Sequence, residues 1–179
     1  LNTICDETKA SYILTAHHAN DLIETVFINM LRGTGINGLK GIAEKNKNLV
    51  RPLLFATKVE VEQYAKENNI TFRLDKSNLE DKYERNFIRL NVIPSLKILN
   101  PTFERTFIEN THRWKEEGGI VSSYLYDRWG KLAVKNNNKI ILKKQHLLSE
   151  PFLESLLNFG LKDFGFSSTQ FENIITNLN

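Results

Sequence analysis

The chain has 179 residues and a formal net charge of +3 at pH 7, from 24 lysines and arginines against 21 aspartates and glutamates. This weak positive charge permits nucleic-acid binding without arguing for it, and a hydrophobic content of 41% is ordinary for a globular protein. The single cysteine, Cys5, excludes an internal disulfide and a cysteine-based metal site, which fits the cytoplasmic location that we expect. No apolar run approaches the ~20 residues of a membrane-spanning helix, so no membrane association is expected.

The first elements predict a strand followed by a helix. Residues 12–16 form a short apolar run of the kind found in a buried parallel strand, and His17 and His18 end it. Asn20 is the predicted N-cap of the next helix, with Asp21 in its first turn. Because ligands bind at the carboxyl ends of strands in open α/β sheets, we expect a substrate near these polar residues. The helix ends at the first of four glycines, Gly33, Gly35, Gly38 and Gly41, which predict an irregular segment.

The next segment predicts a second strand and helix. Residues 48–55 are the predicted strand, and Thr57 with Glu60 forms a capping box that opens a helix ending near Asn68. Beyond it the pattern predicts, in order, an extended run at 70–73, a polar loop at 75–82 and a helix over 87–96 that is interrupted at Pro94.

From Pro101 onward the pattern becomes helical, so we expect a domain boundary there. A long helix is predicted over residues 101–129, with Gly118–Gly119 as its weak point. The remaining predicted elements are a hairpin over 132–142, a helix over 150–164 and a helix from the capping box of Ser167 and Gln170 to Leu178. These patterns predict the α/β fold class, followed by a mainly helical domain.

Five motifs occur in a fixed order between His17 and Arg89. They are His17-His18-x-Asn20-Asp21-x-x-Glu24-Thr25, Arg32-Gly33-x-Gly35-x-x-Gly38-Leu39-x-Gly41, Arg51-Pro52-Leu53-Leu54, Asp75-x-Ser77-Asn78 and Tyr83-x-Arg85-Asn86-x-Ile88-Arg89. Together they resemble the tRNA(Ile)-lysidine synthetases, which belong to the PP-loop family of ATP pyrophosphatases. The resemblance is close from Leu1 to Pro101 and weak beyond.

Two features depart from that family. The family usually has two acids after the histidines, whereas the first is Asn20 here, so we expect Asn20→Asp to be tolerated. The family's phosphate loop, Ser-Gly-Gly-x-Asp-Ser, lies upstream of the histidines and does not occur in this sequence. The resemblance therefore implies that residues 1–99 are the C-terminal part of a parallel-sheet PP-loop domain, of the adenine nucleotide alpha hydrolase-like fold. Residues 100–179 would be a mainly helical tRNA-binding domain, and we expect this chain alone to be inactive.

The resemblance implies a carbon–nitrogen ligase that acts in two steps. ATP, with Mg²⁺, adenylates C2 of the wobble cytidine of tRNA(Ile) carrying a CAU anticodon, and the amine of free lysine then displaces AMP. Two other functions stay open. One is another PP-loop tRNA-modifying enzyme, although a single cysteine argues against the thiolating branch, and the other is a non-catalytic tRNA-binding module. The oligomeric state also stays open.

His17 and Asp21 are the predicted catalytic residues, because the resemblance places them where ATP and the wobble cytidine meet. Asp21 would either hold Mg²⁺ against the phosphates or deprotonate the lysine amine. Spacing alone favours a plainer role, in which Asp21 caps the helix and compensates its dipole. Zinc binding by His17 and His18 together is disfavoured, since adjacent side chains point in different directions and no cysteine assists.

Cations and glycines supply the other predicted contacts. Arg32, Gly33 and Gly35 form a predicted ATP phosphate site, because the N–H groups of a glycine loop and a guanidinium bind anions. The alternative is a tight connection between two elements.

Arg85, Asn86 and Arg89 are predicted to bind tRNA, with both arginines on one helix face. The alternative is a solvated helix surface, paired with Asp81 and Glu84. In the second domain we expect Arg105, Arg113 and Arg128 to contact tRNA phosphates, and Trp114 and Trp129 to lie in the core.

Overall fold

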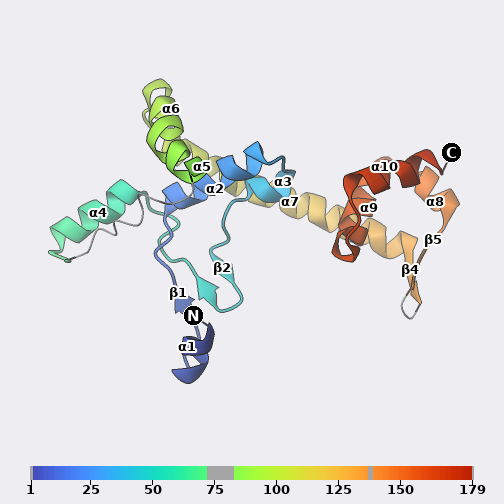
Figure 1. Cartoon of the computed structure of the whole chain (residues 1–179), viewed down its shortest axis with the longest axis horizontal. Coiled ribbons are helices and arrows are strands. Elements are labelled where there is room, and N and C mark those ends of the chain that lie inside the picture. Colours follow the sequence, from blue (N-terminus) through green and yellow to red (C-terminus); the bar gives the residue numbers. More distant parts are fainter. Residues whose placement is uncertain (1, 72–82, 137–138, 179) are drawn as a thin grey trace. The chain divides into compact units, whose positions relative to one another are not determined.

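The computed structural model describes residues 2–71, 83–136 and 139–178 and belongs to the predicted mixed α/β class (Figure 1). Its contacts form two compact units, residues 1–118 and 119–179. The division lies at Gly118–Gly119, inside a long helix, because the first part of that helix packs with upstream residues. The domain boundary expected at Pro101 stays a prediction. Some predicted features lie outside the described residues. They are the end of the extended run (72–73), the motif at 75–78 with the rest of its loop to 82, and two of the three asparagines in the hairpin turn.

The sheet of the first unit is small and mixed. Strand β1 (Ile13–Leu14) pairs in parallel with β3 (Leu49–Val50), and β2 (Lys45–Asn46) pairs with β3 in antiparallel fashion. Both predicted strands are therefore present but shorter than expected. Pro52 has no N–H to donate and limits the second strand. The prediction of a buried first strand is wrong in the described residues, since Leu14 is 67% exposed.

The first unit is otherwise helical. Helix α2 begins after His18, so the predicted N-cap at Asn20 is wrong, and the glycine segment that follows contains a short helix. The capping box of Thr57 and Glu60 is confirmed at the start of α4. The helical elements are α1 (Asn2–Glu7), α2 (Ala19–Leu31), α3 (Ile36–Leu39), α4 (Lys58–Glu67), α5 (Tyr83–Phe87), the π-helical η2 (Ile88–Val92), α6 (Ile93–Leu99) and α7 (Phe103–Leu132).

The predicted helix is interrupted next to Pro94 by π-helical turns, although it does not end there. Helical backbone runs from Tyr83 to Leu99, and the five residues Ile88–Val92 form π-helical turns just before the proline. A proline ring clashes with the carbonyl one α-helical turn earlier, and a wider turn relieves that clash. Arg89 lies in this widened segment.

A hydrophobic core fixes α2 against the helices around it. Ile23 and Val26 of α2 are fully buried, with Ile88, Ile93 and Phe107 in the same cluster. Figure 1 shows α5 lying beside α2, and the two helices are in contact. Trp114 packs edge-on against Phe107, which confirms its predicted core role. This packing holds α5 and η2 beside the first turns of α2.

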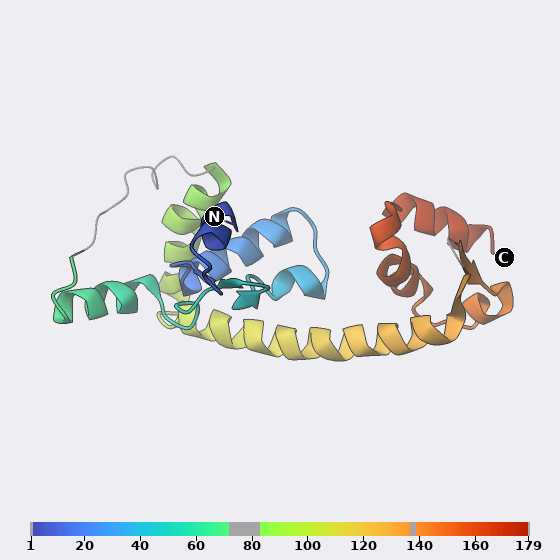
Figure 2. The ribbon, with the colours of Figure 1, turned by 90° about the horizontal axis from the view of Figure 1, so that it is seen from below.

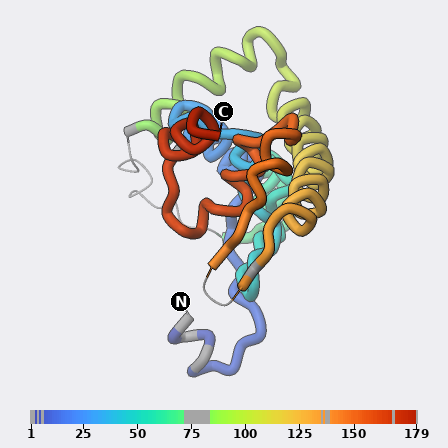
Figure 3. The backbone as a smooth tube through the Cα atoms, turned by 90° about the vertical axis from the view of Figure 1, so that its right-hand side faces the viewer, coloured from blue at the N-terminus to red at the C-terminus, as the bar shows by residue number. Residues whose placement is uncertain are grey.

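Helix α7 is continuous through its glycine pair (Figure 2). It leads into the second unit, whose strands β4 (Ala133–Asn136) and β5 (Lys139–Leu142) form the predicted hairpin (Figure 3). Leu157, Leu161 and Phe171 are buried in that unit, and Trp129 packs against them as predicted. The remaining elements are α8 (Lys144–Leu148), α9 (Leu153–Leu161), the 3-10 helix η3 (Lys162–Phe164) and α10 (Ser168–Thr176), the last of which opens with the predicted capping box.

Candidate functional site

A polar cavity of about 380 Å³ lies at the N-terminal end of α2. Four predicted site residues, His17, Asp21, Arg85 and Arg89, line it, although two of them precede or open α2 and two lie on α5 and η2. The structure thus brings the first and last sequence motifs together. Its other lining residues are Ala16, His18 and Lys58.

Local backbone contacts build this end of the cavity. The backbone N–H of His18 donates to Asp21 Oδ2 at 2.9 Å, so Asp21 does cap the helix, as the plainer interpretation proposed. The N–H of Ala19 donates to the carbonyl of Ala56 at 2.8 Å and joins the start of α2 to the segment before α4. Asp21 nevertheless lines the cavity and keeps its side chain 15% exposed. Capping and a chemical role are therefore compatible.

Glu24 holds the two arginines of the cavity. Its carboxylate is fully buried and accepts from Arg89 at 2.7 Å (Nε) and 3.0 Å (Nη2), and Arg85 Nε lies 3.5 Å away. Arg85 also donates to Thr25 Oγ1 at 3.3 Å, and Arg89 Nη2 lies 3.9 Å from Asp21 Oδ1. Both arginines contact Glu24, which confirms the predicted shared helix face. Of the two acids in the alternative pairing, Glu84 pairs instead with Arg32, and Asp81 lies outside the described residues. Glu24 holds these two cations at the cavity from its buried position.

The two histidines have different surroundings. His17 Nδ1 lies 2.9 Å from Thr15 Oγ1, which fixes its ring on the cavity wall. Burial lowers the pKa of His18 below its ordinary value of 6.5, and the carboxylates of Asp21 and Glu24 oppose this only in part. His18 is therefore neutral at pH 7. Among the described residues, no group of three or more His, Cys, Asp or Glu side chains is placed to hold a metal ion.

The lowered pKa of His18 predicts a pH-dependent stability. The unfolded chain binds the His18 proton more tightly than the folded chain, so protonation favours unfolding as the pH falls below 6.5. We expect His18→Gln to reduce the loss of unfolding free energy between pH 7.5 and 5.5. Urea unfolding of the wild-type and variant proteins at several pH values measures this loss. Equal losses in the two proteins would contradict the prediction.

Several predicted site residues lie elsewhere. The cavity lies at the N-terminal end of α2, and this helix is roughly 20 Å long. Arg32, Gly33 and Gly35 follow its other end and do not line the cavity. Arg32 pairs with Glu84 at 2.8 Å on the surface, and Gly33 has a φ of +76°, so a tight connection accounts for this segment.

Asn86 is half-buried on α5 and also does not line the cavity. In the second half of the chain, Arg128 pairs with the buried carboxylate of Glu150, whereas Arg105 and Arg113 are exposed. Arg128 is therefore engaged within its own unit.

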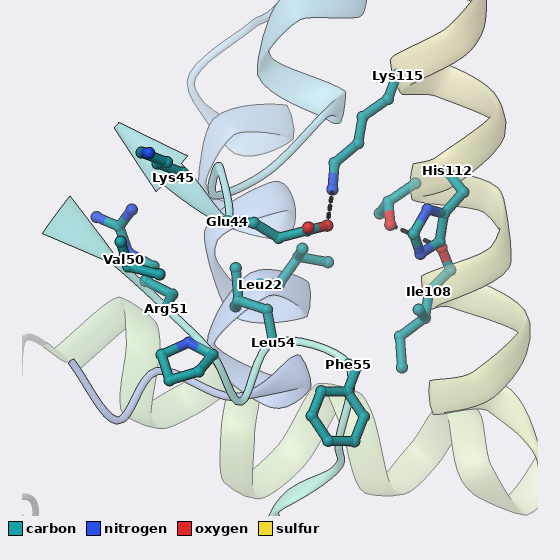
Figure 4. Close-up of a pocket in the computed structure, with 12 residues that line it drawn as sticks. Leu22, Glu44, Lys45, Val50, Arg51, Leu54, Phe55, Ile108, His112 and Lys115 are labelled. Atoms are coloured by element: carbon teal, nitrogen blue, oxygen red, sulfur yellow. Dashed lines mark hydrogen bonds and ion pairs between the residues drawn. The ribbon is translucent and has the colours of Figure 1, made fainter. Parts of the chain in front are cut away.

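A second cavity, of about 470 Å³, contains none of the predicted site residues (Figure 4). Leu22, Leu54 and Ile108 give it an apolar wall, and Lys115 reaches Glu44 across its rim at 3.4 Å. Its polar residues include Glu44, Arg51 and His112, but none of them is a predicted site residue, whereas four predicted site residues line the cavity beside α2. The smaller cavity beside α2 is the better candidate for chemistry.

Residues 1–96, more than half of the chain, match the PP-loop domain family. The chain belongs to this family. The match covers β1, α2, β3 and α4 together with the helices that carry both arginines, so every residue lining the candidate cavity lies within the PP-loop region.

This PP-loop chain is similar to proteins named tRNA(Ile)-lysidine synthase. The protein of Bacteroides thetaiotaomicron is 35% identical over 98% of this chain and 40% of its own length. The protein of Thermosipho africanus is 48% identical over 62% of this chain and 26% of its own length, and that of Porphyromonas gingivalis is 34% identical over 97% of this chain and 37% of its own length. The chain thus spans at most 40% of the length of these relatives.

None of the described helices is long and apolar enough to cross a membrane.

Proposed function

We propose that the full-length protein is a cytoplasmic tRNA(Ile)-lysidine synthase, which ligates lysine to C2 of the wobble cytidine of tRNA(Ile) at the expense of ATP. The observation that carries this proposal is similarity to a protein of that name along 98% of the chain. The clustering of His17, Asp21, Arg85 and Arg89 in one cavity supports it, because these residues come from separate motifs.

We place these residues within a larger architecture. Residues 1–99 would form the C-terminal part of a parallel-sheet PP-loop domain, which the parallel pairing of β1 and β3 supports. Residues 100–179 would form a mainly helical domain that positions tRNA, and exposed Arg105 and Arg113 suit phosphate contacts there.

The cavity offers groups suited to both chemical steps. Arg85 and Arg89 would neutralise phosphate charge during adenylation, with Glu24 fixing their orientation. Asp21 or His17 would take the proton from the lysine amine when it displaces AMP. For His17, contact of Nδ1 with Thr15 leaves Nε2 as the nitrogen that exchanges a proton.

Mg²⁺ fits this cavity as an ion shared with phosphate. Magnesium is commonly held by one or two carboxylates together with substrate phosphates. Asp21 is the carboxylate that lines the described cavity, and Oδ1 is the oxygen not engaged by the His18 N–H. A bound Mg²⁺ would lower the negative charge of the phosphates, with Asp21 as its protein ligand.

Lysidine formation tests the proposed function directly. The full-length protein is incubated with ATP, radiolabelled lysine and tRNA(Ile) bearing a CAU anticodon, and we expect label to enter the tRNA. The same tRNA with cytidine replaced by uridine at the wobble position is the control and should remain unlabelled. ATP–pyrophosphate exchange without lysine transfer would favour another PP-loop enzyme, and tRNA binding without either activity would favour a non-catalytic module.

A further inference from the structure

Lys58 adds a cation to the candidate cavity that none of the sequence motifs contains. It is the first residue of α4 and lines the cavity together with residues at the start of α2. We propose that Lys58 binds a phosphate oxygen of the bound nucleotide and that Asn20 is the positioning residue that holds Lys58 there. This inference rests on the proposed function for the identity of the nucleotide, and on the geometry alone for anion binding.

Lys58 differs from Arg85 and Arg89 in that its ion-pair partner is an exposed carboxylate and not the buried Glu24. Glu24 binds the guanidinium groups of Arg85 and Arg89 from the buried side. The ammonium of Lys58 lies 3.8 Å from Glu62 Oε1, and both side chains are well exposed, so their attraction is weak. A compact ammonium with three donors binds phosphate well as a point charge. Lys58 can therefore exchange its surface partner for an anion at little cost.

Asn20 fixes the backbone from which Lys58 projects. Its Oδ1 accepts the N–H of Lys58 at 2.9 Å, and its Nδ2 donates to Glu104 Oε1 at 2.6 Å. The backbone bond from Ala19 to Ala56 joins the same two segments a second time. Asn20 thus ties the first turn of α4 to α2 and to Glu104 at the start of α7, and these three segments lie in the first unit.

An amide is the group that suits this position. It must accept from one neighbour and donate to the other, and a carboxylate cannot donate. Glu104 is largely buried, and its other carboxylate oxygen accepts from Lys97 Nζ at 2.8 Å. Asn20→Asp would place two carboxylates in contact, which argues against the tolerance expected from the resemblance. Glu104→Gln, which supplies a new amide donor, should relieve the damage in the Asn20→Asp background.

Binding of inorganic pyrophosphate to the full-length protein, measured by calorimetry, tests the proposal without requiring lysidine formation. We expect Lys58→Ala to weaken binding about ten- to a hundredfold and Lys58→Arg to restore most of it. Lys66→Ala, which removes an exposed lysine from the far end of α4, is the matched control and should bind normally. Asn20→Ala should weaken binding in the wild-type background but have little further effect in the Lys58→Ala background.

The outcomes separate this inference from the proposed function. Unchanged pyrophosphate affinity in the Lys58→Ala protein would overturn the anion-binding role of Lys58. Equal effects of Asn20→Ala in both backgrounds would show that Asn20 does not act through Lys58. Thermal unfolding of each variant identifies any that fail to fold. If Lys58→Ala does not fold, Lys58→Gln replaces it in the pyrophosphate measurement. If Asn20→Ala does not fold, the Asn20→Asp variant is compared with the Asn20→Asp, Glu104→Gln double variant. If the wild-type protein binds pyrophosphate but forms no lysidine, the proposed function fails while the role of Lys58 stands.

Discussion

Replacing Glu24 by glutamine is expected to lower the free energy of unfolding of the first unit by about 3 kcal/mol, because a buried carboxylate that neutralises two arginines would be lost. Glu24 has no exposed surface, and it receives two hydrogen bonds from Arg89 and an ion pair from Arg85. Glutamine keeps the size of the side chain but presents N–H donors to guanidinium donors. The arginines are 27% and 31% exposed, so water compensates them in part and holds the cost near the lower end for a buried pair.

Hydrogen exchange of the α2 and α5 backbone amides in the full-length protein measures this loss locally, without assuming that the whole protein unfolds in one step. Glu84→Gln is the matched control, since Glu84 pairs with Arg32 at 2.8 Å on the surface with both side chains more than half exposed. That change should cost less than about 1 kcal/mol. Similar costs for the two variants would mean that Glu24 is not the electrostatic anchor of the cavity.

Elements with local signals were predictable from the sequence. Thr57 with Glu60 and Ser167 with Gln170 form capping boxes, whose hydrogen bonds connect residues three positions apart, so they need no tertiary contact. The N-cap at His18 was missed because histidine is not a preferred capping residue, and the cap is completed by the carboxylate of Asp21. The strand lengths were overestimated because pairing partners, and not apolar runs, decide where a ladder ends.

The candidate site was predictable where the motifs carried it. His17, Asp21, Arg85 and Arg89 share a cavity, but no pattern in the sequence indicates how far the two arginines lie from His17 and Asp21. Lys58 was missed because it belongs to no motif, although a usable signal existed. The capping box starts α4 directly after the second strand segment, and neighbouring parallel strands end at the same edge of a sheet.

Arg32 is a predicted site residue that the described cavity does not include. Its glycine-rich surroundings suit an anion, but α2 separates it from the cavity and Glu84 engages its charge. A phosphate role for Arg32, Gly33 and Gly35 stays a prediction, and the described geometry places it outside the cavity.

Asp21 has two roles in the structure, and one substitution separates them. Its Oδ2 accepts the N–H of His18 at 2.9 Å, which an asparagine oxygen can also do, whereas only a carboxylate can hold Mg²⁺ strongly or act as a general base. The nearest cation, Arg89 Nη2, lies 3.9 Å away and keeps its bonds to Glu24 without Asp21. Loss of the Asp21 charge should therefore affect chemistry far more than folding.

We expect Asp21→Asn in the full-length protein to lower the turnover of lysidine formation by ~10²-fold or more, the usual scale for a lost acid–base group, and to change unfolding free energy by less than about 1 kcal/mol. Glu60→Gln is the matched control, since Glu60 is the equivalent capping acid of α4 and does not line the cavity. It should retain near-normal turnover with a comparably small loss of stability. If Asp21→Asn also turns over normally, capping is sufficient to explain Asp21. If turnover falls only as far as stability does, the effect is structural, because a chemical role requires a loss of rate in a protein that remains folded.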